Sequence, residues 1–150
     1  MKIIIQRKRI FPILIILFLW NAGLLLAPIL KGSENPLLKN LALWLYRLYD
    51  PVCHQLPERS WHIDATPLPT CIRCTVFYFS GLLITIYYFF KQSITLFSLK
   101  YYILLGTPTI LDFTIELSGL YHDIAFIRFF TAILLSFALF HCLIRSICLK

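Results

Sequence analysis

The chain has 150 residues, of which 59% are hydrophobic and only 14% are charged. A soluble domain carries about 25% charged residues, so this composition excludes an ordinary water-soluble domain and indicates a membrane protein. The formal net charge is +7, but the basic residues lie between apolar runs and form no basic stripe interleaved with exposed aromatic residues. This distribution argues against nucleic-acid binding and favours contact with lipid head groups.

The first apolar run, Ile10 to Leu30, contains no charged residue. At about 1.5 Å per residue it is long enough to cross the ~30 Å hydrocarbon core. Basic residues precede it, as they precede a signal peptide, but the apolar part of a signal peptide has about 7–15 residues and ends at a small-x-small site. Because this run is longer and Ala27-Pro28-Ile29 is a poor cleavage site, we expect a retained transmembrane helix over about residues 10–30.

Residues 36–49 predict a shorter helix. Asn35-Pro36 is typical of an N-cap followed by the first helical residue. Apolar residues then recur at helical spacing, namely Leu37, Leu41, Trp44, Leu45 and Leu48. This segment is too short to cross a bilayer, so we expect an amphipathic helix that lies in the membrane interface.

Three further spans are expected, at about residues 72–90, 101–121 and 124–145. The sequence therefore predicts one all-α integral membrane domain over residues 1–150, with four transmembrane helices surrounded by the lipid bilayer. Four spans put both termini on one side. That side also carries more of the basic residues, which predicts a multi-pass protein of the cell membrane with cytoplasmic termini.

A proline-rich loop over residues 50–74 carries the clearest chemical signal. It contains Cys53 and His54, then His62, and ends with Cys71-Ile72-Arg73-Cys74. A tetrahedral zinc site needs four ligands, and two cysteines separated by two residues can bind one ion from a single turn. Cys53, Cys71 and Cys74 with one histidine would complete such a site, and from the residues alone His54 and His62 are equal candidates for the fourth ligand.

Two other interpretations of the cysteines are open. Some of them can be buried thiols beside a helix start, because free cysteine packs as a small hydrophobic residue. Alternatively, Cys71 and Cys74 form a redox dithiol at a helix N-terminus, where the helix dipole and Arg73 would lower the thiol pKa. Quinone-linked membrane thiol oxidoreductases use such a pair but usually need a second outward pair, and only Cys53 is left here.

Three charged residues fall within the expected spans. Asp112 and Glu116 are four residues apart and hence on one helix face, and a carboxylate within a span is costly unless it faces protein or water. Arg128 lies at a depth similar to that of Glu116 on the next helix, so the sequence predicts that these two side chains form an ion pair. In the functional alternative, Asp112, Glu116 and Arg128 line a polar pocket with His122 at its rim, and are the catalytic candidates of a metal-dependent membrane hydrolase.

Several of these motifs occur together in one family. Cys53-His54-Gln55, Glu58-Arg59-Ser60 and Cys71-Ile72-Arg73-Cys74-Thr75, followed by Leu111-Asp112 and by Arg128, resemble domain of unknown function family 2085 over about residues 49–133. Val76 and Phe113 stand where that family tends to have glycine. The resemblance implies a polytopic membrane protein and favours His54 as the fourth ligand, but it implies no activity.

The preferred interpretation is a membrane protein with an outward-facing zinc site of structural or accessory character. A closed site of three cysteines and one histidine leaves no position for a water molecule, which favours the structural role. The thiol oxidoreductase and the hydrolase are the alternatives, and whether the protein is an enzyme stays open at this stage. The sequence identifies no substrate, no protein partner and no oligomeric state.

Overall fold

The computed structural model describes residues 2–4, 7–91, 93–118 and 124–149. About 79% of the described residues are helical. The described residues form the helices α1 (Arg7–Lys31), α2 (Pro36–Tyr49), α3 (Ile72–Lys91), α4 (Leu99–Leu117) and α5 (Ala125–Leu149), the short 3-10 turns η1 (Asp50–Val52) and η2 (Pro57–Arg59), and the short strands β1 (Lys2–Ile4), β2 (His62–Ile63), β3 (Thr66–Pro67) and β4 (Ser93–Thr95).

The fold prediction is confirmed: the protein is all-α, with helices of the membrane type. Three of the described helices, α1, α3 and α5, are long and apolar enough to cross a membrane. Their outward surfaces are apolar, as the exposed side chains of Ile16, Leu83 and Leu139 illustrate, and lipid is the solvent that suits such surfaces.

Helix α4 occupies the position of the predicted span over residues 101–121. Its 19 described residues include Asp112 and Glu116, the two acidic residues that the described parts of the four long helices contain. Residues 119–121 of that expected span lie outside the described part of the chain. The crossing of the membrane by α4 therefore stays a prediction.

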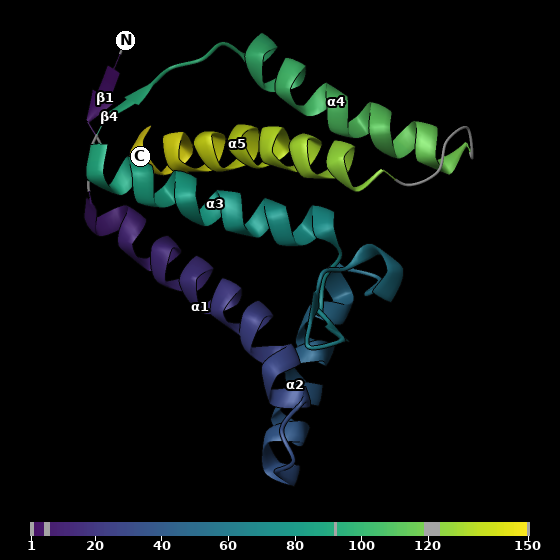
Figure 1. Ribbon diagram of the computed structural model, residues 1–150. Helices are drawn as coiled ribbons and strands as arrows, with labels where there is room; N and C mark the ends of the chain where they lie inside the picture. The colour runs from purple at the N-terminus through teal and green to yellow at the C-terminus, as the bar shows by residue number, and fades with distance from the viewer. Residues whose placement is uncertain (1, 5–6, 92, 119–123, 150) are drawn as a thin grey trace.

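Helix α5 lies between α3 and α4, and α1 packs against both α3 and α2 (Figure 1). Polar bonds join these helices within apolar surroundings. Ser136 donates a hydrogen bond to the carbonyl of Phe77 (2.9 Å), and Thr109 donates one to the carbonyl of Thr131 (2.8 Å). Such bonds between neighbouring helices stabilise membrane bundles by about 1 kcal/mol or less each.

Both ends of the described chain lie at the same end of the helices (Figure 1). There β1 pairs antiparallel with β4, and Arg9 donates a hydrogen bond to the carbonyl of Ile147 (3.0 Å). Arg145 donates a similar bond to the carbonyl of Phe97 (3.0 Å). No sequence pattern predicted this two-stranded sheet between segments about 90 residues apart.

The opposite end of the helices carries α2 and the proline-rich loop over residues 50–74, from here on called the cysteine loop. Asn35 caps α2 by accepting the N–H of Leu37 (2.9 Å), as its sequence position predicts. The helix then packs back against α1, and the Tyr49 hydroxyl donates to the carbonyl of Trp20 (2.7 Å). Its outer face remains apolar, since Leu37 and Trp44 are mostly exposed, which suits the expected interfacial position.

Gly81 is a point of close contact between α3 and α5. A Cβ atom at this position would lie 2.2 Å from the ring of Phe140, which is itself buried. Gly106 of α4 has open space around the equivalent point, with nothing within 4 Å. Both glycines are helical, so alanine gains about the same helix propensity at either site. They form a matched pair for testing the packing.

We therefore expect Gly81→Ala to destabilise the protein by about 1–3 kcal/mol through overpacking, despite its better helix propensity. Gly106→Ala should leave the stability unchanged or raise it slightly. Thermal unfolding in detergent measures both effects. A Gly81→Ala protein that melts at or above the temperature of Gly106→Ala would contradict the close α3–α5 contact.

Candidate functional site

The start of α3 presents two of the cysteines. Cys71 immediately precedes the helix, and its carbonyl accepts the N–H of Thr75 (2.9 Å), the first bond of the helical ladder. The hydroxyls of Thr70 and Thr75 hydrogen-bond to each other (2.8 Å) and fix this first turn. Cys71 and Cys74 are three residues apart, so the turn places their side chains on one face of the helix.

The turns after α2 bring Cys53 to the same place. η1 ends at Val52, and the N–H of Cys53 donates to the carbonyl of Tyr49 (3.1 Å). Gln55 then adopts a left-handed conformation, with φ at 51°, and its side chain donates to the carbonyl of Tyr46 (2.6 Å). A left-handed non-glycine residue is uncommon, and this one stands two residues after Cys53, whose buried sulfur faces the N–H of Cys71.

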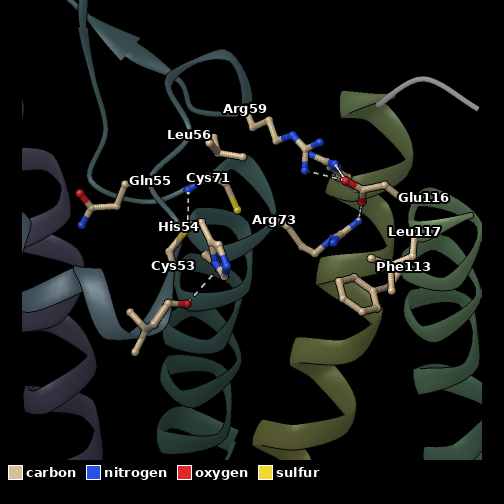
Figure 2. Close-up of a pocket in the computed structure, with 13 residues that line it drawn as sticks. Cys53, His54, Gln55, Leu56, Arg59, Cys71, Arg73, Phe113, Glu116 and Leu117 are labelled. Carbon is tan, nitrogen blue, oxygen red and sulfur yellow. Dashed lines mark hydrogen bonds and ion pairs between the residues drawn. The ribbon is translucent and has the colours of Figure 1, made fainter. Parts of the chain in front are cut away.

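The three sulfur atoms of Cys53, Cys71 and Cys74 lie within 4.8 Å of one another. The backbone N–H of Cys71 donates to the Cys53 sulfur at 3.1 Å (Figure 2). Hydrogen bonds from the Cys71 and Cys74 thiols, together with backbone N–H groups of Cys71 and Gln55, hold the pKa of Cys53 well below its usual value. The pKa of Cys71 is raised, chiefly because its thiol donates to Cys53. The three cysteines therefore form one hydrogen-bonded cluster in which the Cys53 sulfur is the acceptor.

The two candidate histidines lie differently. His54 is exposed and lines the same cavity as the three cysteines, beside Cys53 (Figure 2). Its ring nitrogens do not belong to the group of donor atoms that lie within 4.8 Å of one another in the described chain. His62 is in β2, where it pairs with Pro67, and it does not line this cavity. The structure thus brings the three cysteines together, with His54 nearer to them in the fold than His62.

A second cluster of charged side chains adjoins the sulfurs. Glu116 forms ion pairs with Arg59 (2.6 Å) and Arg73 (3.3 Å) and also pairs with Arg128, which confirms the predicted Glu116–Arg128 pair. Arg73 pairs in addition with Asp112 (2.5 Å), whose side chain is only 2% exposed. Every carboxylate of this cluster is therefore neutralised by a guanidinium group, as low-dielectric surroundings require.

Arg59 and Arg73 are the members of this cluster that sequence reasoning did not identify. Arg73 was considered only for its effect on the neighbouring thiols, and Arg59 only as part of a motif. A signal was available for Arg73, because a positive residue in the first turn of one span lies near the depth of Glu116 in another. Arg59 lies in an irregular loop, so no periodicity could place its side chain.

One cavity of about 400 Å³, the cysteine cavity, contacts both the three cysteines and the charged cluster (Figure 2). Glu116 and Arg128 line it as the sequence analysis expected, whereas Asp112 lies behind Arg73 and lines a neighbouring apolar groove. His122, expected at the rim, is outside the described residues. The cavity is lined by Val52, Cys53, His54, Gln55, Leu56, Arg59, Cys71, Arg73, Cys74, Phe113, Glu116, Leu117 and Arg128.

Comparisons with known proteins agree with this description. The sequence profile of the family described as "Predicted membrane protein (DUF2085)" matches residues 53–142. The chain is also 30% identical to an uncharacterized protein of Methanocaldococcus jannaschii over 136 residues, which cover 87% of each chain. No solved structure matches the chain. The matched region contains all three clustered cysteines and all members of the charged cluster.

The charged cluster leads to a prediction for Glu116. Glu116→Gln keeps the size of the side chain but leaves three guanidinium groups without this carboxylate. We expect a loss of stability near the lower end of about 3–5 kcal/mol, since the cluster is only partly buried. The control is Glu58→Gln in η2, where the glutamate is exposed and should contribute almost nothing. Equal melting temperatures of the two variants in detergent would contradict the structural role of Glu116.

Proposed function

The chain belongs to the DUF2085 family of predicted membrane proteins, and we propose that it is a membrane metalloprotein that binds one zinc ion through Cys53, Cys71 and Cys74. The observation that supports this proposal is the convergence of three sulfur atoms, from two separate segments, to within 4.8 Å of one another. Thiolates bind Zn²⁺ at about 2.3 Å, so one ion needs its sulfur ligands at such mutual distances.

The surroundings of the sulfurs also suit a metal–thiolate site. Backbone N–H groups donate to the Cys53 sulfur, and donors of this kind stabilise and orient thiolate ligands. Three sulfur ligands select a soft or borderline ion, and zinc satisfies this preference without a change of oxidation state. We propose His54 as the fourth ligand, because it lines the cavity beside the cysteines, with His62 as the alternative.

A site of this composition would have a structural or accessory role. The loop between α2 and α3 carries four prolines and consists of short turns and a two-residue hairpin, so it buries little apolar surface of its own. An ion that joins Cys53 to the first turn of α3 would provide the missing cross-link. The competing assignment is a thiol oxidoreductase that forms a Cys71–Cys74 disulfide and is reoxidised by quinone. The two assignments predict opposite states of the cysteines.

We further propose that the protein resides in the cell membrane with both termini in the cytoplasm, which puts the cysteine cavity on the outer side. The proposal rests on the basic residues that precede α1 and on the position of both chain ends at one end of the helices. The cavity lies at the other end, where α3 begins and α4 ends.

The zinc proposal predicts about one zinc ion per chain in protein purified in detergent. Cys53→Ser, Cys71→Ser and Cys74→Ser should each lose the metal, because two thiolates hold Zn²⁺ much more weakly than three. Cys142→Ser is the matched control. This exposed cysteine lies in the C-terminal half of α5, whereas the cysteine site adjoins the N-terminal half. Metal analysis and thiol alkylation before and after chelation measure the outcome.

Two results would revise this assignment. A metal-free protein with a Cys71–Cys74 disulfide and a freely alkylated Cys53 would replace the zinc site with the thiol oxidoreductase. Full zinc loading in both His54→Ala and His62→Ala would keep the three cysteines but eliminate histidine as the fourth ligand.

The orientation is tested by reporters fused to the C-terminus. We expect a fluorescent protein to fold there and alkaline phosphatase to be inactive, because the latter requires the oxidising side of the membrane. Active phosphatase and a dark fluorescent fusion would reverse the topology and place the cysteine cavity in the cytoplasm.

A further inference from the structure

The cysteine cavity continues into the membrane-spanning part of the protein. Arg73 and Cys74 also line a second, apolar space of about 190 Å³ between α3 and α5. Its other lining residues are Phe77, Tyr78, Ala132, Leu135 and Leu139. At 1.5 Å per residue, Leu139 lies about 20 Å along α5 from its first residue, so this α3–α5 groove extends from the membrane face well into the hydrocarbon region.

Arg73 lines both the cavity beside the cysteines and the α3–α5 groove. Its terminal nitrogen pairs with Asp112 and Glu116, and Figure 2 shows the side chain extending from α3 toward Glu116. Its Nε atom is buried and has no hydrogen-bond partner among the described residues. A buried guanidinium donor without an acceptor is unfavourable, and a phosphate or carboxylate oxygen is the acceptor that guanidinium groups bind best.

We infer that this composite site binds an amphiphile, with a phosphate or carboxylate head group beside Arg73 and the three sulfurs and an apolar chain in the α3–α5 groove. The two parts of the site match the two parts of the ligand. The cavity supplies guanidinium and thiol groups at the membrane face, and the groove supplies Ala132, Leu135 and Leu139 below it. The groove holds only part of a lipid, so the rest of the chain would lie in the bilayer.

Simpler ligands fit less well. A free inorganic anion would contact Arg73 but leave the apolar groove unused. An uncharged hydrocarbon chain would fill the groove but leave the Arg73 Nε without an acceptor. Only a ligand with both parts uses the shared position of Arg73 and Cys74. The inference rests on the proposed function, because it names a ligand for the same cavity. However, the contacts of the ligand's apolar chain with α3 and α5 do not require the metal.

The test measures equilibrium binding of radiolabelled dodecyl phosphate to the full chain in an uncharged detergent. We expect saturable binding of about one molecule per chain, and competition by inorganic phosphate or dodecanol at least about tenfold weaker, because each supplies one half of the contacts. Leu135→Trp fills the groove and should weaken binding at least about tenfold. Leu139→Trp, on the exposed rim of the groove, provides the same test if Leu135→Trp does not fold.

Ile110→Trp is the matched control, because Ile110 is an exposed apolar residue of α4 that lines none of the described cavities. It adds the same side chain to the lipid-facing surface and should bind as the native protein does. Inorganic phosphate that competes equally, dodecanol that competes equally, or groove variants that bind like Ile110→Trp would each overturn the inference.

The metal proposal is judged separately by metal analysis of the same samples. Saturable, groove-dependent binding in a chain that holds no zinc would retain the amphiphile and discard the zinc site. A zinc-loaded chain without saturable binding would retain the zinc site and discard the amphiphile.

Discussion

Glu116 is the carboxylate on which the end of the molecule that carries the three clustered cysteines depends. It pairs with arginines from three separate segments, namely Arg59 in the cysteine loop, Arg73 in α3 and Arg128 in α5. A carboxylate or a guanidinium group is costly to bury alone near hydrocarbon, so each group is stable only where the others are present. This mutual requirement fixes the relative positions of α3, α4 and α5, since a shift of one helix would leave a charge without its partner.

At this end of the molecule the ion pairs hold the helices together, which apolar packing alone cannot do in a membrane. In a membrane, apolar side chains meet lipid as readily as they meet each other, and helix association relies on close packing and polar contacts. Near the middle of the helices that packing is the approach of Gly81 to Phe140, and at the end with the termini it is the β1–β4 sheet. At the end with the three clustered cysteines, the charged cluster holds the helices and the proline-rich loop together.

The sequence predicted the parts of this protein that depend on local patterns. Apolar runs indicated the long helices, and Asn35-Pro36 indicated the start of α2. The similar depth of Glu116 and Arg128 in neighbouring helices indicated their ion pair. The β1–β4 sheet was missed because its strands are only three residues long and pair across most of the chain. Arg59 was missed because an irregular loop has no periodicity to direct its side chain. The turn with the left-handed Gln55, which follows Cys53, was also missed, because no residue preference indicates it.

The first turn of α3 connects the two clusters. Arg73 lies between Cys71 and Cys74 in the sequence, so the ion pairs that fix its direction also fix the rotation of this turn about the helix axis. That rotation decides whether the two thiols face Cys53. The charged cluster therefore positions the sulfur atoms and also holds the helices together. The costly charged groups therefore lie where α3 begins, next to the three clustered cysteines.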